Sequence, residues 1–525
     1  MLRIDIRGIL LYLTDFENSL DIGNVMRHSL IVSLLTGILG SLAGINGLAA
    51  TAAPLPAHEQ AIADVILGEM AIEENQLDQA HDYYLAATQL SHDPNSAKRT
   101  TYLALAAGQA TMALDAAKQW ATLAPKDNEA QLIYIDLLLK TNQATAALPY
   151  LQRVLAVASH DTLNTIIGEL EQLPVDTQQK MLAAIMALPA SQQAEPKLLL
   201  ITSQLQFQIG QPEQADKTID MVLVKQPAWP QAIALKADYL IHLNQLDNAL
   251  QFARDQSARF PNQPMIQLIY VEILIKANQQ KLAISKLQTL TNYPETRGVA
   301  LITLAQLAIQ QKDEISAQRY LQQATADPVQ ANAAYYLLGQ IYQLEHKPEL
   351  AIKAYTQVTD GTYYLTSQLK AAMLMSSLNQ DQDALQLLSN VNVDNMDQAK
   401  QVILLQVELL LKTKQAPLAM QVLNKAIAAI PDDIELLYAR SMVANEMDDN
   451  VQCEKDLKQI LVLDPNQTTA LNALGYLLIN TPTRYQEALS YTQRALTLAP
   501  QNPAVLDTMG WLQYHMGNYQ SAYHY

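Results

Sequence analysis

The chain has 525 residues, of which 50% are hydrophobic and 16% are charged, so it can bury an extensive core and does not belong to the disordered class. Its formal net charge is −17, and a diffusely acidic surface repels phosphate backbones, which argues against nucleic acid as a partner. Glycine is scarce and no stretch alternates polar and apolar residues at strand period, so we predict an all-helical protein.

The N-terminal segment contains an uncharged run over residues 30–50. Arg27 precedes this run, and Ala50-Thr51-Ala52 follows it with the small-x-small pattern of a signal-peptide cleavage site. We therefore predict an N-terminal extension plus signal peptide over residues 1–52. Two alternatives stay open, because a run of this length also suffices for a membrane anchor that is not cleaved or for a buried helix.

A small residue recurs through residues 80–522. Successive recurrences are 33 to 35 residues apart, except for one gap of 68 residues that spans two periods. A supersecondary unit repeated in this way stacks on its neighbours and builds a scaffold with a long surface. The recurring residues are Ala80, Ala113, Ala147, Ala215, Ala249, Ala283, Ala317, Ala351, Ala384, Ala419, Cys453, Ala488 and Ala522.

Residues 434–467 show how one repeat is built. Apolar and small residues recur at intervals of three and four over two stretches, which predicts one buried stripe on each of two helices. Asp448-Asp449-Asn450 forms a polar turn between the stretches, and Pro465 closes the repeat because proline cannot continue a helix. In other repeats the second helix is stopped by Pro125, Pro227, Pro261, Pro294, Pro328, Pro431 or Pro500.

Three positions of the repeat demand particular residue types. Position 8 holds Gly339, Gly475 or Gly510, where the first helix must approach its neighbour closely. Position 20 carries the recurring small residue, so Cys453 is predicted to be a buried core residue rather than a reactive thiol. Position 15 ends the first helix and favours a left-handed backbone, for which glycine and asparagine are suited. It is filled by Asn75, Asn142, Gly210, Asn244, Asn278, Asn379 and Gly517.

This pattern resembles the tetratricopeptide repeat (TPR), a unit of two antiparallel helices with small residues at positions 8 and 20, aromatic or aliphatic residues at 4, 11 and 24, and proline at 32. The resemblance covers residues 61–525 and implies an all-α, right-handed TPR superhelix (an α-solenoid) of about 13–14 helix-turn-helix units. We assign residues 53–525 to this solenoid. The recurrence fails at 162–195, where we expect an irregular unit, and the chain stops at Tyr525 inside a second helix, which we interpret as a truncated last unit.

In TPR arrays the first helices line the concave surface with positions 2, 5, 9 and 12. In the last three repeats these positions hold Glu435, Tyr438, Met442 and Asn445; Thr469, Asn472, Tyr476 and Ile479; and Ala504, Asp507, Trp511 and Tyr514. Aromatic and amide side chains in a concave groove suit the capture of an extended or helical peptide. The candidate peptide-binding residues are therefore Tyr438, Met442, Asn472, Tyr476, Asp507, Trp511 and Tyr514.

Two qualifications apply to this groove. The alternative interpretation is that Tyr476 and Trp511 merely pack between adjacent helices. Some TPR co-chaperones grip a peptide carboxylate with lysine and arginine at these positions, which hold no basic residue in the last three repeats. The carboxylate-clamp function is therefore not carried over to this chain.

The sequence contains no motif for catalysis, cofactor binding or metal binding. The nine histidines are scattered without zinc-ligand spacing, and neither a glycine-rich phosphate loop nor a Gly-x-Ser-x-Gly elbow occurs. Asp381-x-Asp383 comes nearest to a metal motif, and we interpret it as a solvated turn between two helices. We therefore expect no enzymatic activity, no cofactor and no metal site.

The C-terminal repeats resemble a subgroup of Gram-negative envelope TPR proteins. The resemblance is carried by Leu474-Gly475-Tyr476, Arg484-Tyr485-x-Glu487-Ala488 and Leu506-Asp507-Thr508-Met509-Gly510-Trp511. Some members are outer-membrane lipoproteins that bind and activate a carboxyl-terminal-processing protease and present its substrates. This resemblance implies an exported adaptor in the periplasm or on the periplasmic face of the outer membrane. No cysteine lies near Ala52, so the lipid attachment of those lipoproteins is not carried over.

The expected partners are other proteins: an envelope protease, its substrates or assembly machinery. The alternative function is an assembly or chaperone-like factor for outer-membrane proteins or polysaccharide export machinery. The alternative location is the inner membrane, with the N-terminal segment as anchor.

Overall fold

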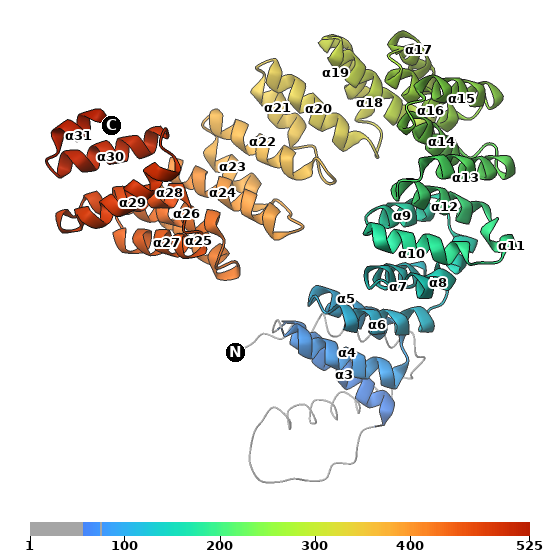
Figure 1. Cartoon of the computed structure of the whole chain (residues 1–525), viewed down its shortest axis with the longest axis horizontal. Coiled ribbons are helices and arrows are strands. Elements are labelled where there is room, and N and C mark those ends of the chain that lie inside the picture. Colours follow the sequence, from blue (N-terminus) through green and yellow to red (C-terminus); the bar gives the residue numbers. More distant parts are fainter. Residues whose placement is uncertain (1–55, 74–75) are drawn as a thin grey trace, which may run out of the picture. The chain divides into compact units, whose positions relative to one another are not determined.

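The computed structural model describes residues 56–73 and 76–525. All regular secondary structure in these ranges is helical. The chain divides after Pro261 into two compact units, and Figure 1 shows each unit as a succession of paired helices. The predicted signal peptide and the turn residue Asn75 lie outside the described ranges.

In the first unit the helices form hairpins, with three additional helices between α8 and α12. The helices are α3 (Ala57–Glu73) with α4 (Leu77–Ser91), α5 (Pro94–Ala106) with α6 (Ala110–Leu123), α7 (Asn128–Lys140) with α8 (Ala144–Val157), then α9 (His160–Glu171), α10 (Val175–Met186) and α11 (Ala190–Gln193), and finally α12 (Pro196–Gln208) with α13 (Pro212–Lys225) and α14 (Pro230–His242) with α15 (Leu246–Arg259).

In the second unit every α-helix belongs to a hairpin. The pairs are α16 (Pro264–Lys276) with α17 (Gln280–Leu290), α18 (Pro294–Gln310) with α19 (Glu314–Ala324), α20 (Ala331–Leu344) with α21 (Pro348–Tyr355), α22 (Tyr364–Ser377) with α23 (Asp381–Ser389), α24 (Met396–Lys412) with α25 (Ala416–Ala429), α26 (Ile434–Glu446) with α27 (Asn450–Leu463), α28 (Thr468–Ile479) with α29 (Tyr485–Leu498), and α30 (Pro503–His515) with α31 (Tyr519–His524). A short 3-10 helix, η1 (Pro482–Arg484), precedes α29.

The recurring small residues lie on the second helix of each hairpin. The eleven alanines from Ala80 to Ala488 are completely buried, Cys453 is 4% exposed, and Ala522 is half-buried. A methyl-sized side chain at this position lets the two helices of a hairpin approach closely. The predicted all-α solenoid of helix-turn-helix units is confirmed. Burial also raises the pKa of the Cys453 thiol to about 11, in keeping with a core role.

Residues 160–193 depart from the regular hairpin. Helix α10 packs against α8 and α12, and α9 packs against α12. Pro174 lies between α9 and α10 and caps the second of them. Buried Gln178 donates from Nε2 to the carbonyl oxygens of Leu170 and Leu173, at 3.0 Å each. A side chain thus satisfies helix-end carbonyls at a place where the repeat supplies no regular neighbour.

Two other buried glutamines donate hydrogen bonds to backbone carbonyls at or just beyond the end of a second helix. Gln131 occupies position 4 of its repeat and donates from Nε2 to the Ala121 carbonyl oxygen at 2.8 Å. Gln368, also at position 4, donates to the Val358 carbonyl oxygen at 2.8 Å. The sequence pattern predicts an apolar residue at this position, and the carbonyls left free at the end of the preceding helix explain the exception.

The predicted prolines follow the ends of second helices within a few residues. Helix α17 ends at Leu290, before Pro294, and α19 ends at Ala324, before Pro328. Pro294 also begins α18, where its fixed φ and missing N–H suit the first helical turn.

The described hairpin turns, apart from the one between α28 and α29, contain one residue with positive φ at position 15. The six predicted residues within the described ranges adopt it, with φ between 57° and 82°. Five further residues at the same position adopt it too, namely Gly108, Lys312, His346, Lys414 and Asp448. Three of these five are neither glycine, asparagine nor aspartate, so the hairpin imposes the backbone conformation on residues that disfavour it.

Replacing Lys312 or Lys414 with glycine is expected to raise the free energy of unfolding by about 0.5–1 kcal/mol each, because glycine adopts positive φ without a steric penalty. Both lysines are exposed and their φ is 58°, so little else is lost. Urea unfolding followed by circular dichroism measures the effect. The matched control is Lys425→Gly in the exposed middle of α25, which should lower stability by about 1 kcal/mol. Equal destabilisation by all three changes would contradict the prediction.

Candidate protein-binding surface

The candidate groove residues lie on the first helices of the last three hairpins, α26, α28 and α30, all within the second unit. Helix α28 buries Leu471, Leu474 and Leu478 at intervals of three and four residues, together with most of its other apolar residues. Thr469 and Tyr476 are the exposed residues of this helix. Helices α28 and α30 contact one another directly, so their outward faces form one continuous surface.

The structure places most of the predicted groove residues on accessible surface. Tyr476 is 49% exposed, Trp511 46% and Tyr514 53%. About half of each side chain is thus accessible to a partner, and the other half packs against the protein. Met442 and Asp507 are also exposed, whereas Tyr438 and Asn472 are half-buried. Burial raises the pKa of the Tyr438 hydroxyl. Of the lining positions named from sequence, Ile479 is wrong, because its side chain lies in the core at 2% exposure.

An aromatic cluster covers the exposed face of α30. Trp511 and Tyr514 stack with ring centroids 5.6 Å apart and an interplanar angle of 8°. His515 meets the Trp511 ring edge-on at 4.6 Å, and Tyr519 of α31 meets Tyr514 at 5.5 Å. His515 and Tyr519 were missed as groove residues. The spacing of four residues between Trp511 and His515 indicates a shared helix face, whereas Tyr519 lies on α31 and only the structure brings it to Tyr514. Stacking fixes large side chains at the surface before any ligand arrives.

Polar groups flank the aromatic cluster. Asn472 Oδ1 is buried and has no hydrogen-bond partner within the described ranges. Such an unpaired buried acceptor costs about 1–3 kcal/mol. Glu435 pairs with Lys400 of α24 at 2.9 Å, and Lys400 also pairs with Asp433 at 3.1 Å. This lysine near the groove is therefore already engaged by two carboxylates.

Ion pairs join the hairpins beneath this surface. Arg484 binds Glu454 of α27 through both terminal nitrogens, at 2.6 and 2.7 Å, and binds Glu487 of α29 from Nε at 2.8 Å. The hydrogen bonds from Arg484 hold the pKa of Glu454 at about 2. The network ties α27 to α29, the second helices of two adjacent hairpins.

The described ranges hold no cluster of three or more potential metal ligands. Asp381, interpreted from sequence as part of a solvated turn, instead begins α23 and is paired. Its Oδ1 accepts from Ser376 Oγ and from Lys412 Nζ, at 2.8 Å each, and these bonds lower its pKa. The turn interpretation is therefore wrong for Asp381, which joins α22, α23 and α24.

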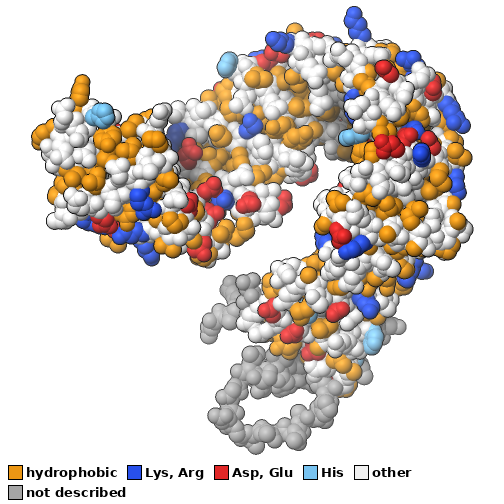
Figure 2. Space-filling view, in the orientation of Figure 1, with side chains coloured by type: hydrophobic (Ala, Val, Ile, Leu, Met, Phe, Trp, Pro, Cys, Tyr) orange, Lys and Arg blue, Asp and Glu red, His pale blue; other side chains and the backbone are white. Residues whose placement is uncertain are grey.

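Surface composition in the second unit is mixed. Figure 2 shows hydrophobic side chains scattered over the visible face among uncharged polar ones, with charged side chains few and of both signs. None of the helices in the described ranges is both long and apolar enough to cross a lipid bilayer.

Comparison with known proteins identifies the repeat directly at one place. A tetratricopeptide-repeat profile matches residues 333–360. This segment is the hairpin of α20 and α21, whose position 8 is Gly339 and position 20 is Ala351. The chain is also similar to the TPR repeat-containing protein PA4667 of Pseudomonas aeruginosa, with 27% identity over 468 residues that cover 89% of this chain and 79% of the relative.

Two solved structures are similar to most of this chain at low scores. The APC/C hetero-tetramer Cut9-Hcn1 gives a TM-score of 0.28 at 12% identity, covering 87% of this chain and 96% of that one. Yeast Tom70 gives a TM-score of 0.27 at 12% identity, with coverages of 88% and 96%. Neither similarity carries functional information for this chain.

Proposed function

We propose that this protein is a non-enzymatic scaffold of the cell envelope that captures extended peptide segments in the groove of α26, α28 and α30. The observation that carries the proposal is the exposed stack of Trp511 on Tyr514; Tyr476 of α28 and Met442 of α26 are exposed as well. Large, rigid aromatic side chains contribute most of the binding energy in protein interfaces. The carboxylate of exposed Asp507 can accept hydrogen bonds from the N–H groups of a peptide backbone.

The proposed role is to tether a carboxyl-terminal-processing protease to its substrates. A solenoid that binds one partner on each of two surfaces raises their effective concentration without taking part in the chemistry. This part of the proposal is supported by the envelope-type motifs around Tyr476, Arg484 and Trp511. Export is supported by the uncharged run over 30–50 with its small-x-small exit.

The test is photo-crosslinking in living cells. A photoreactive p-benzoylphenylalanine replaces Tyr514 in one variant and Val462 in a control, because Val462 is 81% exposed but lies on α27 outside the groove. We expect a defined set of envelope proteins, including the protease or its substrates, to crosslink from position 514 and not from position 462. Identical crosslinking from both positions would contradict binding in this groove.

The partner identified by mass spectrometry distinguishes the two candidate functions, protease tethering and assembly of envelope proteins. Recovery of outer-membrane proteins or a synthase complex, together with protease activity unchanged by loss of this protein, would contradict tethering and favour an assembly factor. For whichever partner is found, Trp511→Ala with Tyr514→Ala should weaken binding at least tenfold, because both anchors are removed. Tyr523→Ala, a change at a 90% exposed tyrosine, is the control and should leave the affinity unchanged.

A further inference from the structure

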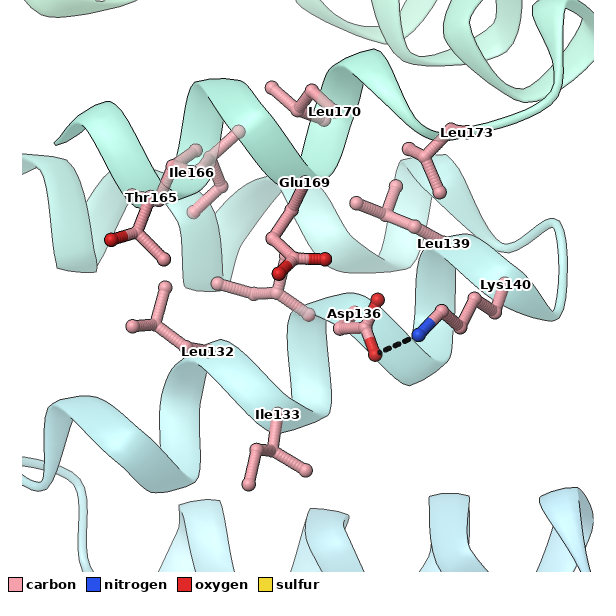
Figure 3. Close-up of a pocket in the computed structure, with 12 residues that line it drawn as sticks. Leu132, Ile133, Asp136, Leu139, Lys140, Thr165, Ile166, Glu169, Leu170 and Leu173 are labelled. Carbon is pink, nitrogen blue, oxygen red and sulfur yellow. Dashed lines mark hydrogen bonds and ion pairs between the residues drawn. The ribbon is translucent and has the colours of Figure 1, made fainter. Parts of the chain in front are cut away.

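A separate pocket lies in the first unit between α7 and α9. It has a volume of about 210 Å³. Its walls are mainly aliphatic, and in Figure 3 Leu132 of α7 and Ile166 of α9 face one another. The aliphatic lining comprises Leu132, Ile133, Ile135, Leu139, Leu151, Ile166, Leu170 and Leu173.

The pocket forms where the repeat fails. Leu132, Asp136 and Leu139 occupy positions 5, 9 and 12 of their repeat, the same positions that carry the groove residues in the second unit. The facing helix α9 belongs to the irregular stretch and presents Ile166, Glu169 and Leu170 to the pocket. The lining is therefore built from the concave face of a regular hairpin and from a helix outside the regular pattern.

Two carboxylates stand at this pocket with a single cation. Asp136 Oδ2 pairs with Lys140 Nζ at 2.8 Å, one turn further along α7. Glu169 extends from α9 toward Asp136 in Figure 3, is exposed, and its carboxylate has no hydrogen bond or ion pair within the described ranges. The charged lining residues sum to −1, from Asp136, Glu169 and Lys140. An anionic ligand would be repelled, and a cation would find Glu169 free to accept.

The volume limits the size of the occupant. Sites for drug-sized ligands and cofactors occupy about 300–1,000 Å³, which is larger than this pocket. At about 30 Å³ per water, the space is equivalent to about seven water molecules, which suits one leucine, isoleucine or phenylalanine side chain. The aliphatic wall is complementary to an apolar side chain of a peptide, and the Glu169 carboxylate beside it is complementary to a basic side chain next to that apolar residue.

We propose that this pocket binds a peptide segment of a partner protein in which an aliphatic side chain enters between Leu132 and Ile166 while a neighbouring arginine or lysine pairs with Glu169. The site lies in the first unit and is chemically distinct from the aromatic groove of the second unit. It gives the scaffold a second binding surface with its own sequence preference.

The test is a titration of the full-length protein with short peptides, followed by methyl NMR. The probe peptides are Gly-Ser-Ala-Leu-Arg-Ala-Ser-Gly and two variants in which Arg is replaced by Gln or Leu by Ser. The δ1 methyl groups of Ile133 and Ile166 report occupancy of the pocket directly. We expect the Leu-Arg peptide to shift both resonances and to bind about tenfold more tightly than either variant, because each variant removes one of the two contacts.

Two substitutions distinguish the contribution of the Glu169 charge to peptide binding from that of the apolar cavity. In Glu169→Gln, the Leu-Arg and Leu-Gln peptides should bind with equal affinity, because the ion pair is gone while the aliphatic walls remain. Leu132→Trp should fill the pocket and abolish the shift with every peptide. The matched control is Glu213→Gln, an exposed carboxylate on α13, which should preserve the tenfold preference.

Three outcomes would overturn the proposal: methyl resonances that do not move at millimolar peptide, equal affinity for the Leu-Arg and Leu-Gln peptides, or an unchanged preference in Glu169→Gln. Trp511→Ala leaves this titration unaffected if the two sites are independent. Failure of the aromatic groove and failure of this pocket are therefore distinguishable.

Discussion

Replacing Arg440 with methionine is expected to destabilise the hairpin of α26 and α27 by about 3–5 kcal/mol, because it leaves a completely buried carboxylate without its counter-ion. Asp456 has 0% exposure. Arg440 donates to its Oδ2 from Nε at 2.8 Å and to its Oδ1 from Nη2 at 2.7 Å. Asn424 of α25 and Gln452 of α27 complete the network, at 2.9 and 2.8 Å.

The double variant Arg440→Met with Asp456→Leu decides whether the charge or the packing matters. Removing both partners should restore most of the lost stability, since a buried ion pair is often no more stabilising than an apolar pair of similar volume. Hydrogen exchange over residues 434–463 and urea unfolding measure the change locally and globally. The control Lys180→Met breaks an exposed pair with Asp176 on α10 and should cost less than about 0.5 kcal/mol. A loss in Arg440→Met as small as in this control would contradict the prediction.

Replacing Gly339 with valine is expected to destabilise the hairpin of α20 and α21 by about 2–4 kcal/mol, because the added atoms overlap a buried ring. A Cβ at Gly339 would lie 2.5 Å from Cε1 and 2.6 Å from Cδ1 of Tyr355. Tyr355 is fully buried, and its hydroxyl donates to Gln343 Oε1 at 3.1 Å, so the ring cannot easily move aside. Even Gly339→Ala should be destabilising, although alanine favours a helix by up to about 1 kcal/mol over glycine.

The control for this prediction is Gly168→Ala in α9, where an added Cβ meets no atom within 4 Å. That change should stabilise the protein by about 0.5–1 kcal/mol through helix propensity alone. Gly339→Ala should become less unfavourable in a Tyr355→Leu background, since the overlapping ring is then absent. Thermal unfolding and hydrogen exchange of residues 331–355 give the comparison, and equal effects at Gly339 and Gly168 would refute a steric origin.

The repeat could be predicted from sequence because packing in the hairpin core restricts which residue types can occupy certain positions of each repeat. The buried position 20 has room only for a small side chain, so it holds alanine or cysteine in each regular repeat. The recurring residues from Ala80 to Cys453 and Ala488 follow from this requirement. Position 8 behaves in the same way, since Gly339 and Gly475 lie against side chains of the second helix. These are local requirements of one hairpin, so they recur with the period of the chain.

Other features could not be predicted, because they depend on contacts between residues far apart in sequence. The groove positions keep no common residue type, and only their exposure in the structure shows that Tyr476 and Trp511 are accessible while Ile479 is not. The pairing of Arg440 with Asp456 joins two helices whose individual patterns contain no mark of it. Lys312 likewise shows that packing of a hairpin overrides a residue's own backbone preference.

The sequence by itself thus determined the period, the two helices of each repeat and the buried residue types, because close packing within one hairpin constrains each of them locally. Trp511 and Tyr514 were predicted from their repeat positions, but only the tertiary structure brought Tyr519 of α31 against Tyr514 and placed Glu169 of α9 at the pocket with α7. These contacts join residues of different helices, one of which belongs to the irregular stretch. The period of the repeat therefore carries no information about them.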